Sequence, residues 1–420
     1  MAARSFLVSS PDEAGPSAGF YIAFTDAGPH PGYNPDVMKT TILLAIAALA
    51  ALAPADAKGR KHRPEVDPSP AKNKVQVALL LDTSNSMDGL IDQAKTQLWK
   101  VVNTFIDARR GGEAPFVEVA LFEYGNNNQP VGNHYIRQVH PLTRDLDEIS
   151  KQLFALTTNG GEEYCGAVIQ RALTDLTWDD NKRTYKAIFI AGNEPFTQGP
   201  VSPLQVCRDG FSKGILINTI HCGSRSAGVN GSWNDGADLG GGKFMIIDQD
   251  RAVCHIDAPQ DARIRDLGVE LNKTYLGYGS HWREGVAKQA AADKDAAANE
   301  AAGAATQRSV SKASANYYNS SWDLVDAVKE NKVELSKLKP AELPKELQNL
   351  SEAELKQRVE DAAKKRAKLQ QEIQTLNKQR EEYVAAEMKK QAGNGAKTLD
   401  QALVETTRSQ AEKLGYSFGE

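Results

Sequence analysis

The stretch Val75-Gln-Val-Ala-Leu-Leu-Leu-Asp82-Thr-Ser84-Asn-Ser86-Met87 joins an apolar run to a short polar segment. Its first seven residues are almost all apolar and begin with a β-branched valine, a pattern typical of a strand that is covered on both faces. Asp82 follows where the apolar run ends. The stretch therefore predicts a buried strand of a parallel sheet that leads into a polar loop.

The polar loop carries one carboxylate and two hydroxyls at alternate positions, on Asp82, Ser84 and Ser86. Oxygen ligands of this kind suit Mg²⁺, Mn²⁺ or Ca²⁺. Asp and Ser are also preferred residues at helix N-caps, so a capping loop without a metal is the alternative interpretation.

Length and charge narrow the classes of protein to consider. A chain of 420 residues is long enough for roughly two or three domains. The formal net charge of −4 and the pI near 6.1 give no basic field, so nucleic-acid binding is not indicated. Four cysteines lack the paired spacing of a zinc site, and their disulfide pairing is open: Cys165, Cys207, Cys222 and Cys254.

The region that begins at Met38 is typical of a secretory signal peptide. Lys39 precedes an apolar run of about a dozen residues, which ends in small-x-small cleavage signatures at 53–55 and 55–57. We therefore predict an extension from an upstream start at 1–37, a signal peptide at 38–57 and a proline-rich linker at 58–72. The alternative is that the first residues form a true cytosolic extension. The prediction places the protein in the periplasm or outside the cell, without a membrane span after cleavage.

Strand and helix patterns alternate after residue 73. Strands are predicted at 75–81, 116–124, 135–139, 184–191, 215–221 and 244–248, and helices at 89–110, 145–156, 167–176, 203–213 and 258–271. This alternation predicts an α/β fold with a doubly wound, mostly parallel sheet. Such sheets bind ligands beyond the carboxyl ends of their strands.

Three polar turns should meet at that edge: 82–86, the Gly-Gly turn at 160–163, and 193–194. Together with the order of elements, these turns resemble a von Willebrand factor A (VWA) domain over residues 73–282. The resemblance implies a protein-binding module with a metal-ion-dependent adhesion site, at which an acidic side chain of the partner completes the metal's coordination.

Three of the implied metal ligands match that family's motif directly: Asp82, Ser84 and Ser86. The other two positions differ, since Glu162 stands where the family usually has Thr after Gly-Gly, and Asn193 stands where it has Asp. A site of these five residues remains rich in oxygen ligands, so Mg²⁺, or Mn²⁺ or Ca²⁺, is the expected ion. The alternative is a degenerate site whose polar groups cap helices and close loops.

The rest of the chain is predicted to be helical. Residues 283–316 form an Ala-rich spacer, and residues 317–420 form a helical region. Its helices are predicted at 322–338, in a long segment that begins with a capping box at Ser351, and at 398–414. The long central helix has a 4-3 apolar repeat that Arg366 and Arg380 interrupt. It favours a helical hairpin or a short coiled coil able to contact a partner or form an oligomer, with a solvated spacer as the alternative.

No catalytic motif is present, so we expect that the protein is not an enzyme. The nearest candidate is His221 beside Cys222, for which a core or disulfide role is the better interpretation. Two functional hypotheses remain. The first is an exported module that binds or adheres to a protein through a divalent metal, and the second is an envelope scaffold with a metal-free VWA domain whose C-terminal helices bind the partner.

Overall fold

A computed structural model of the chain describes residues 73–88, 91–247, 256–298, 303–391 and 399–418. The predicted extension, signal peptide and linker lie outside these residues, and so does Cys254. None of the helices in the described ranges combines the length and the apolar character that a bilayer crossing requires.

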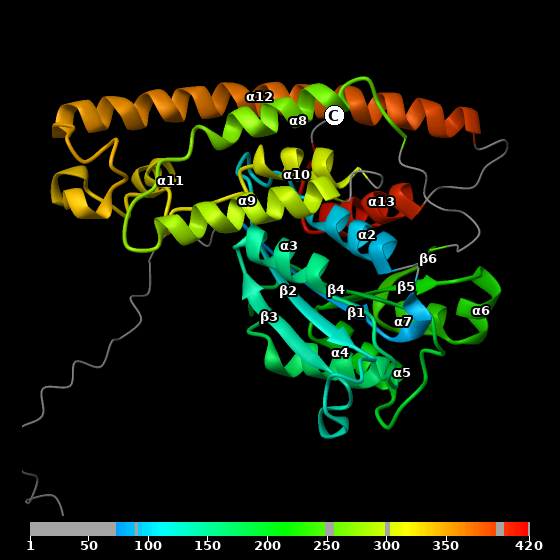
Figure 1. Cartoon of the computed structure of the whole chain (residues 1–420). Helices are drawn as coiled ribbons and strands as arrows, with labels where there is room; N and C mark the ends of the chain where they lie inside the picture. The colour runs from blue at the N-terminus through cyan, green and yellow to red at the C-terminus, as the bar shows by residue number, and fades with distance from the viewer. Residues whose placement is uncertain (1–72, 89–90, 248–255, 299–302, 392–398, 419–420) are drawn as a thin grey trace, which may run out of the picture. The chain divides into compact units, whose positions relative to one another are not determined.

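A six-stranded sheet in the order β3-β2-β1-β4-β5-β6 lies at the centre of the fold (Figure 1). All neighbouring strands are parallel except β3, which is antiparallel to β2. The strands are β1 (Lys74–Asp82), β2 (Phe116–Tyr124), β3 (Arg137–Thr143), β4 (Tyr185–Gly192), β5 (Leu216–Cys222) and β6 (Gly241–Ile247). The predicted doubly wound, mostly parallel sheet is therefore confirmed, with the opening stretch as a central strand.

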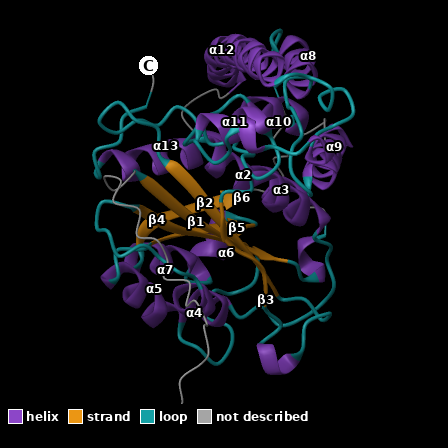
Figure 2. Cartoon of the chain, turned by 90° about the vertical axis from the view of Figure 1, so that its left-hand side faces the viewer, coloured by secondary structure: helices purple, strands orange, loops and turns teal. Residues whose placement is uncertain are grey.

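Helices cover both faces of this sheet (Figure 2). One layer consists of α2 (Ile91–Asn103), α3 (Leu146–Ala155) and α13 (Leu399–Glu412), and the opposite layer of α4 (Cys165–Asp175), α5 (Pro203–Ser212) and α7 (Trp233–Leu239). Val77 and Leu79 of β1 belong to the core under the first layer, whereas Ala78 and Leu80 belong to the core under the second. Burial on both faces explains why the strand is apolar without alternation.

The last helix, α13, is part of the sheet's own covering layer. Leu403 and Ala411 are fully buried in the core beneath α2. Tyr185 of β4 donates a hydrogen bond to Gln410 Oε1 at 2.8 Å, and Gln410 Nε2 donates to Asn218 Oδ1 of β5 at 2.7 Å. Residues 69–420 form one unit. Helix α13 thus belongs to the α/β domain, although it lies far beyond the range 73–282 predicted for that domain.

The predicted Ala-rich spacer forms two packed helices, α9 (Trp282–Ala298) and α10 (Ala304–Lys312). Arg308 of α10 is 3% exposed and makes ion pairs with Asp147 of α3 at 2.5 Å and with Asp293 of α9 at 2.9 Å. Lys312 pairs with Asp293 at 2.7 Å. Because these charges are buried and paired, α9 and α10 are held against α3 despite their thin apolar faces.

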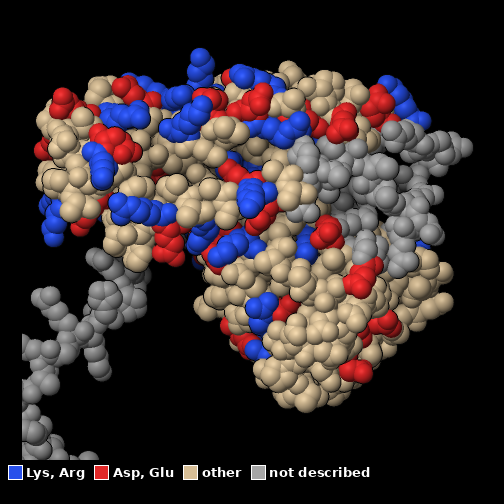
Figure 3. Space-filling view, in the orientation of Figure 1, with Lys and Arg blue, Asp and Glu red and all other residues tan. Residues whose placement is uncertain are grey.

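The long helix α12 (Glu352–Gln391) packs against α8 (Asp261–Asn272), α10 and α11 (Leu324–Lys329). Its predicted apolar repeat contributes Leu355, Val359 and Ala362 to one cluster and Leu369 and Ile373 to another. The apolar face that suggested a coiled coil is therefore buried against other helices of the same chain. Side chains of both charges alternate over the outward face of α12 (Figure 3).

The predicted helix at 322–338 is shorter in the structure, because α11 ends at Lys329. Asn331 adopts a positive φ of 57°, which is incompatible with a continued helix. Two short 3₁₀ helices follow, at Leu335–Lys337 and Pro340–Glu342. Two further 3₁₀ helices lie earlier in the chain, at Asn85–Met87 and Val131–Asn133, and the short helix α6 (Arg225–Asn230) follows β5.

The predicted capping box before α12 forms, which allows a direct test. Glu354 Oε2 accepts from the Ser351 amide at 2.8 Å, and Ser351 Oγ accepts from the Glu354 amide at 3.3 Å. Replacing Ser351 by alanine is expected to lower the free energy of unfolding by about 1 kcal/mol. Urea denaturation measures this loss, with Ser280→Ala, at an exposed turn position, as the control. An equal effect of the two substitutions would contradict the capping role.

Candidate functional site

The candidate site lies beyond the carboxyl ends of β1 and β4. Asp82 is the last residue of β1, and Asn193 directly follows β4. The two strands are hydrogen-bonded neighbours and run parallel, so the polar turns after them meet at one edge of the sheet. This is the edge at which a doubly wound sheet binds its ligands.

Asp82 is fully buried, and half of its carboxylate lacks a partner. Oδ1 accepts a hydrogen bond from the Ser84 amide at 2.8 Å, whereas Oδ2 has no hydrogen-bond partner. Gly192 makes room for the carboxylate, because a Cβ atom there would lie 3.1 Å from Oδ2 and 2.4 Å from the Tyr124 hydroxyl. Burial raises the pKa of Asp82 to about 7.

Hydroxyl and amide groups connect the two turns directly. The Ser84 and Ser86 hydroxyls lie 2.8 Å apart, and Ser86 Oγ donates to Asn193 Oδ1 at 3.1 Å. In return, Asn193 Nδ2 donates to the Ser86 carbonyl at 3.2 Å. The structure thus brings together four of the five residues predicted from the sequence: Asp82, Ser84, Ser86 and Asn193.

The fifth predicted residue, Glu162, is exposed and accepts a hydrogen bond from Gln198 Nε2 at 3.3 Å. The next residue, Glu163, is 7% exposed and is the carboxylate that lies near Asp82. A Cβ atom on Gly125 would meet both groups, at 2.8 Å from Asp82 Oδ1 and 3.0 Å from Glu163 Cγ. Gly125 also has a φ of 74°, so this close approach requires glycine.

Glu163 shares the electrostatic environment of Asp82. Burial raises the pKa of Glu163, and the nearby negative charges of Glu194 and Glu162 add to this effect. The Ser84 hydroxyl acts in the opposite direction and lowers the pKa of Glu163. The residue that sequence reasoning missed is therefore one position further along the loop. The segment before α4 has no regular secondary structure, so no periodic pattern distinguishes the two adjacent glutamates.

The residues present fit a divalent cation. The donors are all oxygens, on Asp82, Glu163, Ser84, Ser86 and Asn193, and one buried carboxylate oxygen is unpartnered. Two buried carboxylates that lie close together repel each other unless a proton or a cation intervenes. Within the described ranges, no group of three or more His, Cys, Asp or Glu side chains is placed to hold a metal, so such a site would depend on its hydroxyl and amide oxygens.

The other chemically notable residues lie inside the fold. Cys165, Cys207 and Cys222 are buried free thiols, and burial raises the pKa of each. His221 is buried, its ring lies 5.6 Å from that of Trp233, and burial lowers its pKa. A thiol held in its neutral form is a poor nucleophile.

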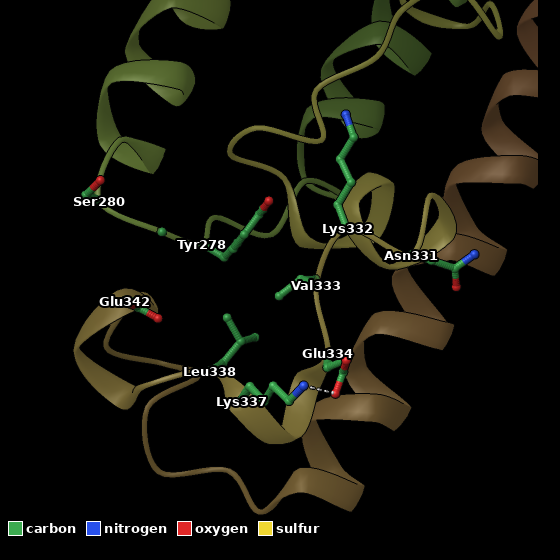
Figure 4. A pocket seen from close by; sticks show the side chains of 10 residues that line it. Tyr278, Ser280, Asn331, Lys332, Val333, Glu334, Lys337, Leu338 and Glu342 are labelled. Carbon is green, nitrogen blue, oxygen red and sulfur yellow. Dashed lines mark ion pairs between the residues drawn. The ribbon is translucent and has the colours of Figure 1, made fainter. Parts of the chain in front are cut away.

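A hollow of about 500 Å³ lies among the C-terminal helices and shares no lining residue with this site (Figure 4). Lys337 in its wall makes an ion pair with Glu334 at 2.8 Å, and Lys332 makes one with Glu330 at 3.2 Å. Lys332 also donates to Ser320 Oγ at 2.8 Å. Because these charges are already paired within the chain, the hollow is a weaker candidate than the edge of the sheet.

No family model and no curated protein matches the chain. Solved structures with a similar fold do match it. Similar structures include the conserved hypothetical protein BatB from Bacteroides thetaiotaomicron, with 16% identity, a TM-score of 0.32, and coverage of 41% of this chain and 90% of that chain. The VWA domain of SpRpn10 has 17% identity, a TM-score of 0.34, and coverage of 43% and 91%.

A third similar structure is proximal thread matrix protein 1 from the mussel byssus, described with a zinc-occupied MIDAS motif. It has 14% identity, a TM-score of 0.32, and coverage of 43% of each chain. The fold itself rests on the strand order and on the position of the polar loop after β1. These features are those of a doubly wound, mostly parallel sheet with helices on both faces and a polar loop at the carboxyl end of a central strand.

Proposed function

We propose that this chain is an exported protein-binding or adhesion module that uses a divalent cation at Asp82. The observation that carries the proposal is the Asp82 carboxylate, fully buried with an unpartnered Oδ2 beside Ser84, Ser86 and a second carboxylate, Glu163. A protein gains no stability from such an arrangement by itself, since an unpaired buried charge is costly. Binding of a cation offsets this cost.

The roles of the residues follow from their positions. Asp82 and Glu163 supply the negative charge that retains an ion, whereas Ser84, Ser86 and Asn193 supply neutral oxygens. Their mutual hydrogen bonds hold the loops after β1 and β4 together. When bound, Mg²⁺, Mn²⁺ or Ca²⁺ would supply a coordination position that a group of the partner protein can fill. This role is binding without catalysis.

Export is part of the proposal and rests on the signal peptide predicted at 38–57. The partner would then be a protein of the cell envelope or of the surroundings. The competing hypothesis of a metal-free scaffold needs C-terminal helices with a free apolar face. The apolar repeat of α12 packs on α8, α10 and α11 of the same chain, so this observation favours the cation site.

Affinity capture from envelope extract of the source organism tests the proposal. In Mg²⁺, wild-type protein is expected to retain a partner that is released by EDTA, and Asp82→Asn should not retain it. Asp180→Asn makes the same chemical change at an exposed position and should behave as the wild type. Retention that is unaffected by both EDTA and Asp82→Asn would refute the cation-dependent function.

A further inference from the structure

A small hollow opens directly beside the candidate cation site. It has a volume of about 240 Å³ and is lined by Asn193, Glu194, Pro195, Ala227, Asn230 and Gly231. Asn193 belongs to both the hollow and the cation site, so a group that enters the hollow would lie next to the ion. The hollow is formed by the turn after β4 and by helix α6.

Glu194 is the one charged residue among the six that line the hollow. Its backbone carbonyl accepts a hydrogen bond from Trp233 Nε1 at 2.8 Å, which fixes the turn. Arg225 lies on the same helix as Ala227 and Asn230, but its guanidinium stands over the Phe244 ring at 5.4 Å and does not line the hollow. Within the described ranges, no side chain forms an ion pair with Glu194.

The charges around the site determine which partner group is attracted. Asp82 and Glu163 together carry two negative charges and would offset those of a divalent ion. Two further carboxylates lie outside these: Glu194, which lines the hollow next to Asn193, and Glu162, which is exposed and directly precedes Glu163. With the ion in place, these two outer carboxylates leave the entrance negative. An incoming carboxylate would meet like charges, whereas a cation would be attracted.

We propose that this hollow binds a lysine or arginine side chain of the partner protein, paired with Glu194 beside the cation site. Pro195 and Ala227 offer apolar surface to the aliphatic stem, and the side-chain amide oxygen of Asn230 can accept a hydrogen bond from the charged end. The buried, unpartnered Asp82 carboxylate marks the adjoining position as a ligand site. The inference rests on the proposed function and changes its chemistry, because the family resemblance implies an acidic partner group.

Fluorescence anisotropy with two labelled peptides tests the inference on the full chain in Mg²⁺. The first peptide, acetyl-Gly-Ser-Lys-Gly-Lys-Ser-Gly-amide, is expected to bind, and the same peptide with glutamate in place of both lysines should bind at least about tenfold more weakly. Glu194→Gln should weaken binding of the lysine peptide about tenfold, because it removes a charge-assisted hydrogen bond. Ala227→Leu, which fills the hollow, should have a similar effect.

Glu162→Gln is the matched control, since it removes the same charge from a residue that does not line the hollow. A small effect of Glu162→Gln beside a large effect of Glu194→Gln supports the hollow as the binding site. Equal effects of the two variants, tighter binding of the glutamate peptide, or no binding of the lysine peptide would each overturn the inference.

A separate Mg²⁺ titration of the same proteins distinguishes the two proposals. Mg²⁺ binding without any effect of Glu194→Gln on the lysine peptide would overturn the role of the hollow alone. No Mg²⁺ binding, together with peptide binding that depends on Glu194, would overturn the cation site alone.

Discussion

Replacing Arg366 by alanine is expected to destabilise the protein by about 3–5 kcal/mol. Arg366 of α12 is 5% exposed, and its Nη1 atom lies 2.7 Å from Asp323 Oδ2 and 2.8 Å from Asp326 Oδ1. Its Nη2 atom donates to the Thr274 carbonyl at 2.8 Å, and its guanidinium stands over the Tyr275 ring at 4.1 Å. Alanine would leave two neighbouring carboxylates buried without their cation.

The environment of these carboxylates explains the size of the expected effect. Burial raises the pKa of Asp326 to about 6, with a further contribution from Asp323, even though Arg366 is present. Without Arg366, one of the two must take up a proton or the helices must separate. Urea denaturation measures the loss, with Arg358→Ala, an exposed arginine of the same helix, as the control. Equal midpoints for the two variants would contradict this account of the packing of α12.

In the presence of EDTA, Asp82→Asn is expected to stabilise the protein at neutral pH. The pKa of Asp82 is about 7 in the folded chain, against an ordinary value of 3.8. The folded state therefore holds this proton more tightly than the unfolded state does, and stability falls as the pH rises from about 4 through 7. The difference corresponds to a loss on the order of 4 kcal/mol, and asparagine, which has no proton to lose, avoids it.

Thermal and urea unfolding in EDTA between about pH 5 and 8 measure this effect. The wild type and Asp180→Asn should lose stability across this range, whereas Asp82→Asn should lose much less. Glu163 also has a raised pKa and adds a slope of the same sign in all three proteins. Identical pH profiles for wild type and Asp82→Asn would show that folding does not raise the pKa of Asp82.

The sheet was predictable because its signals are local. The run from Val75 to Leu81 is apolar at every position but one, and the structure buries alternate residues in cores on both sides of the sheet. The capping box at Ser351 and the returning helix at the end of the chain also follow from short patterns, although the destination of that helix does not. Gln410 forms hydrogen bonds with Tyr185 and Asn218, which lie about 200 residues away in the sequence. Periodic patterns of residue types do not predict contacts between such distant residues.

The candidate site was predictable except for one carboxylate. Asp82, Ser84 and Ser86 stand at fixed spacing after a strand, and Asn193 follows the neighbouring strand, so topology alone brings them together. Glu162 was predicted as the fifth ligand because it directly follows Gly160 and Gly161. The course of the backbone between Gly161 and α4 determines which of two adjacent glutamates faces Asp82, and the structure places Glu163 there.

Buried charges account for the remaining differences. Arg366 and Arg380 interrupt the apolar repeat of α12. From the sequence alone, these two charged residues are expected to weaken the apolar face of the helix. In the structure both are buried, and Arg380 Nε lies 2.6 Å from Asp261 Oδ1 of α8. A charged residue is expected to be exposed unless it is paired, and here the partner lies about 120 residues away in the sequence. The sequence therefore underestimates how much of the surface of α12 is buried against other helices.

Isothermal titration with Mg²⁺, followed by Mn²⁺ and Ca²⁺, at a pH above 7 tests the cation site most directly. The wild type and Asp180→Asn are predicted to bind one ion and to gain thermal stability on binding. Asp82→Asn is predicted to show neither binding heat nor stabilisation. Equal binding by Asp82→Asn and wild type, or no binding of any of the three ions by the wild type, would contradict the account.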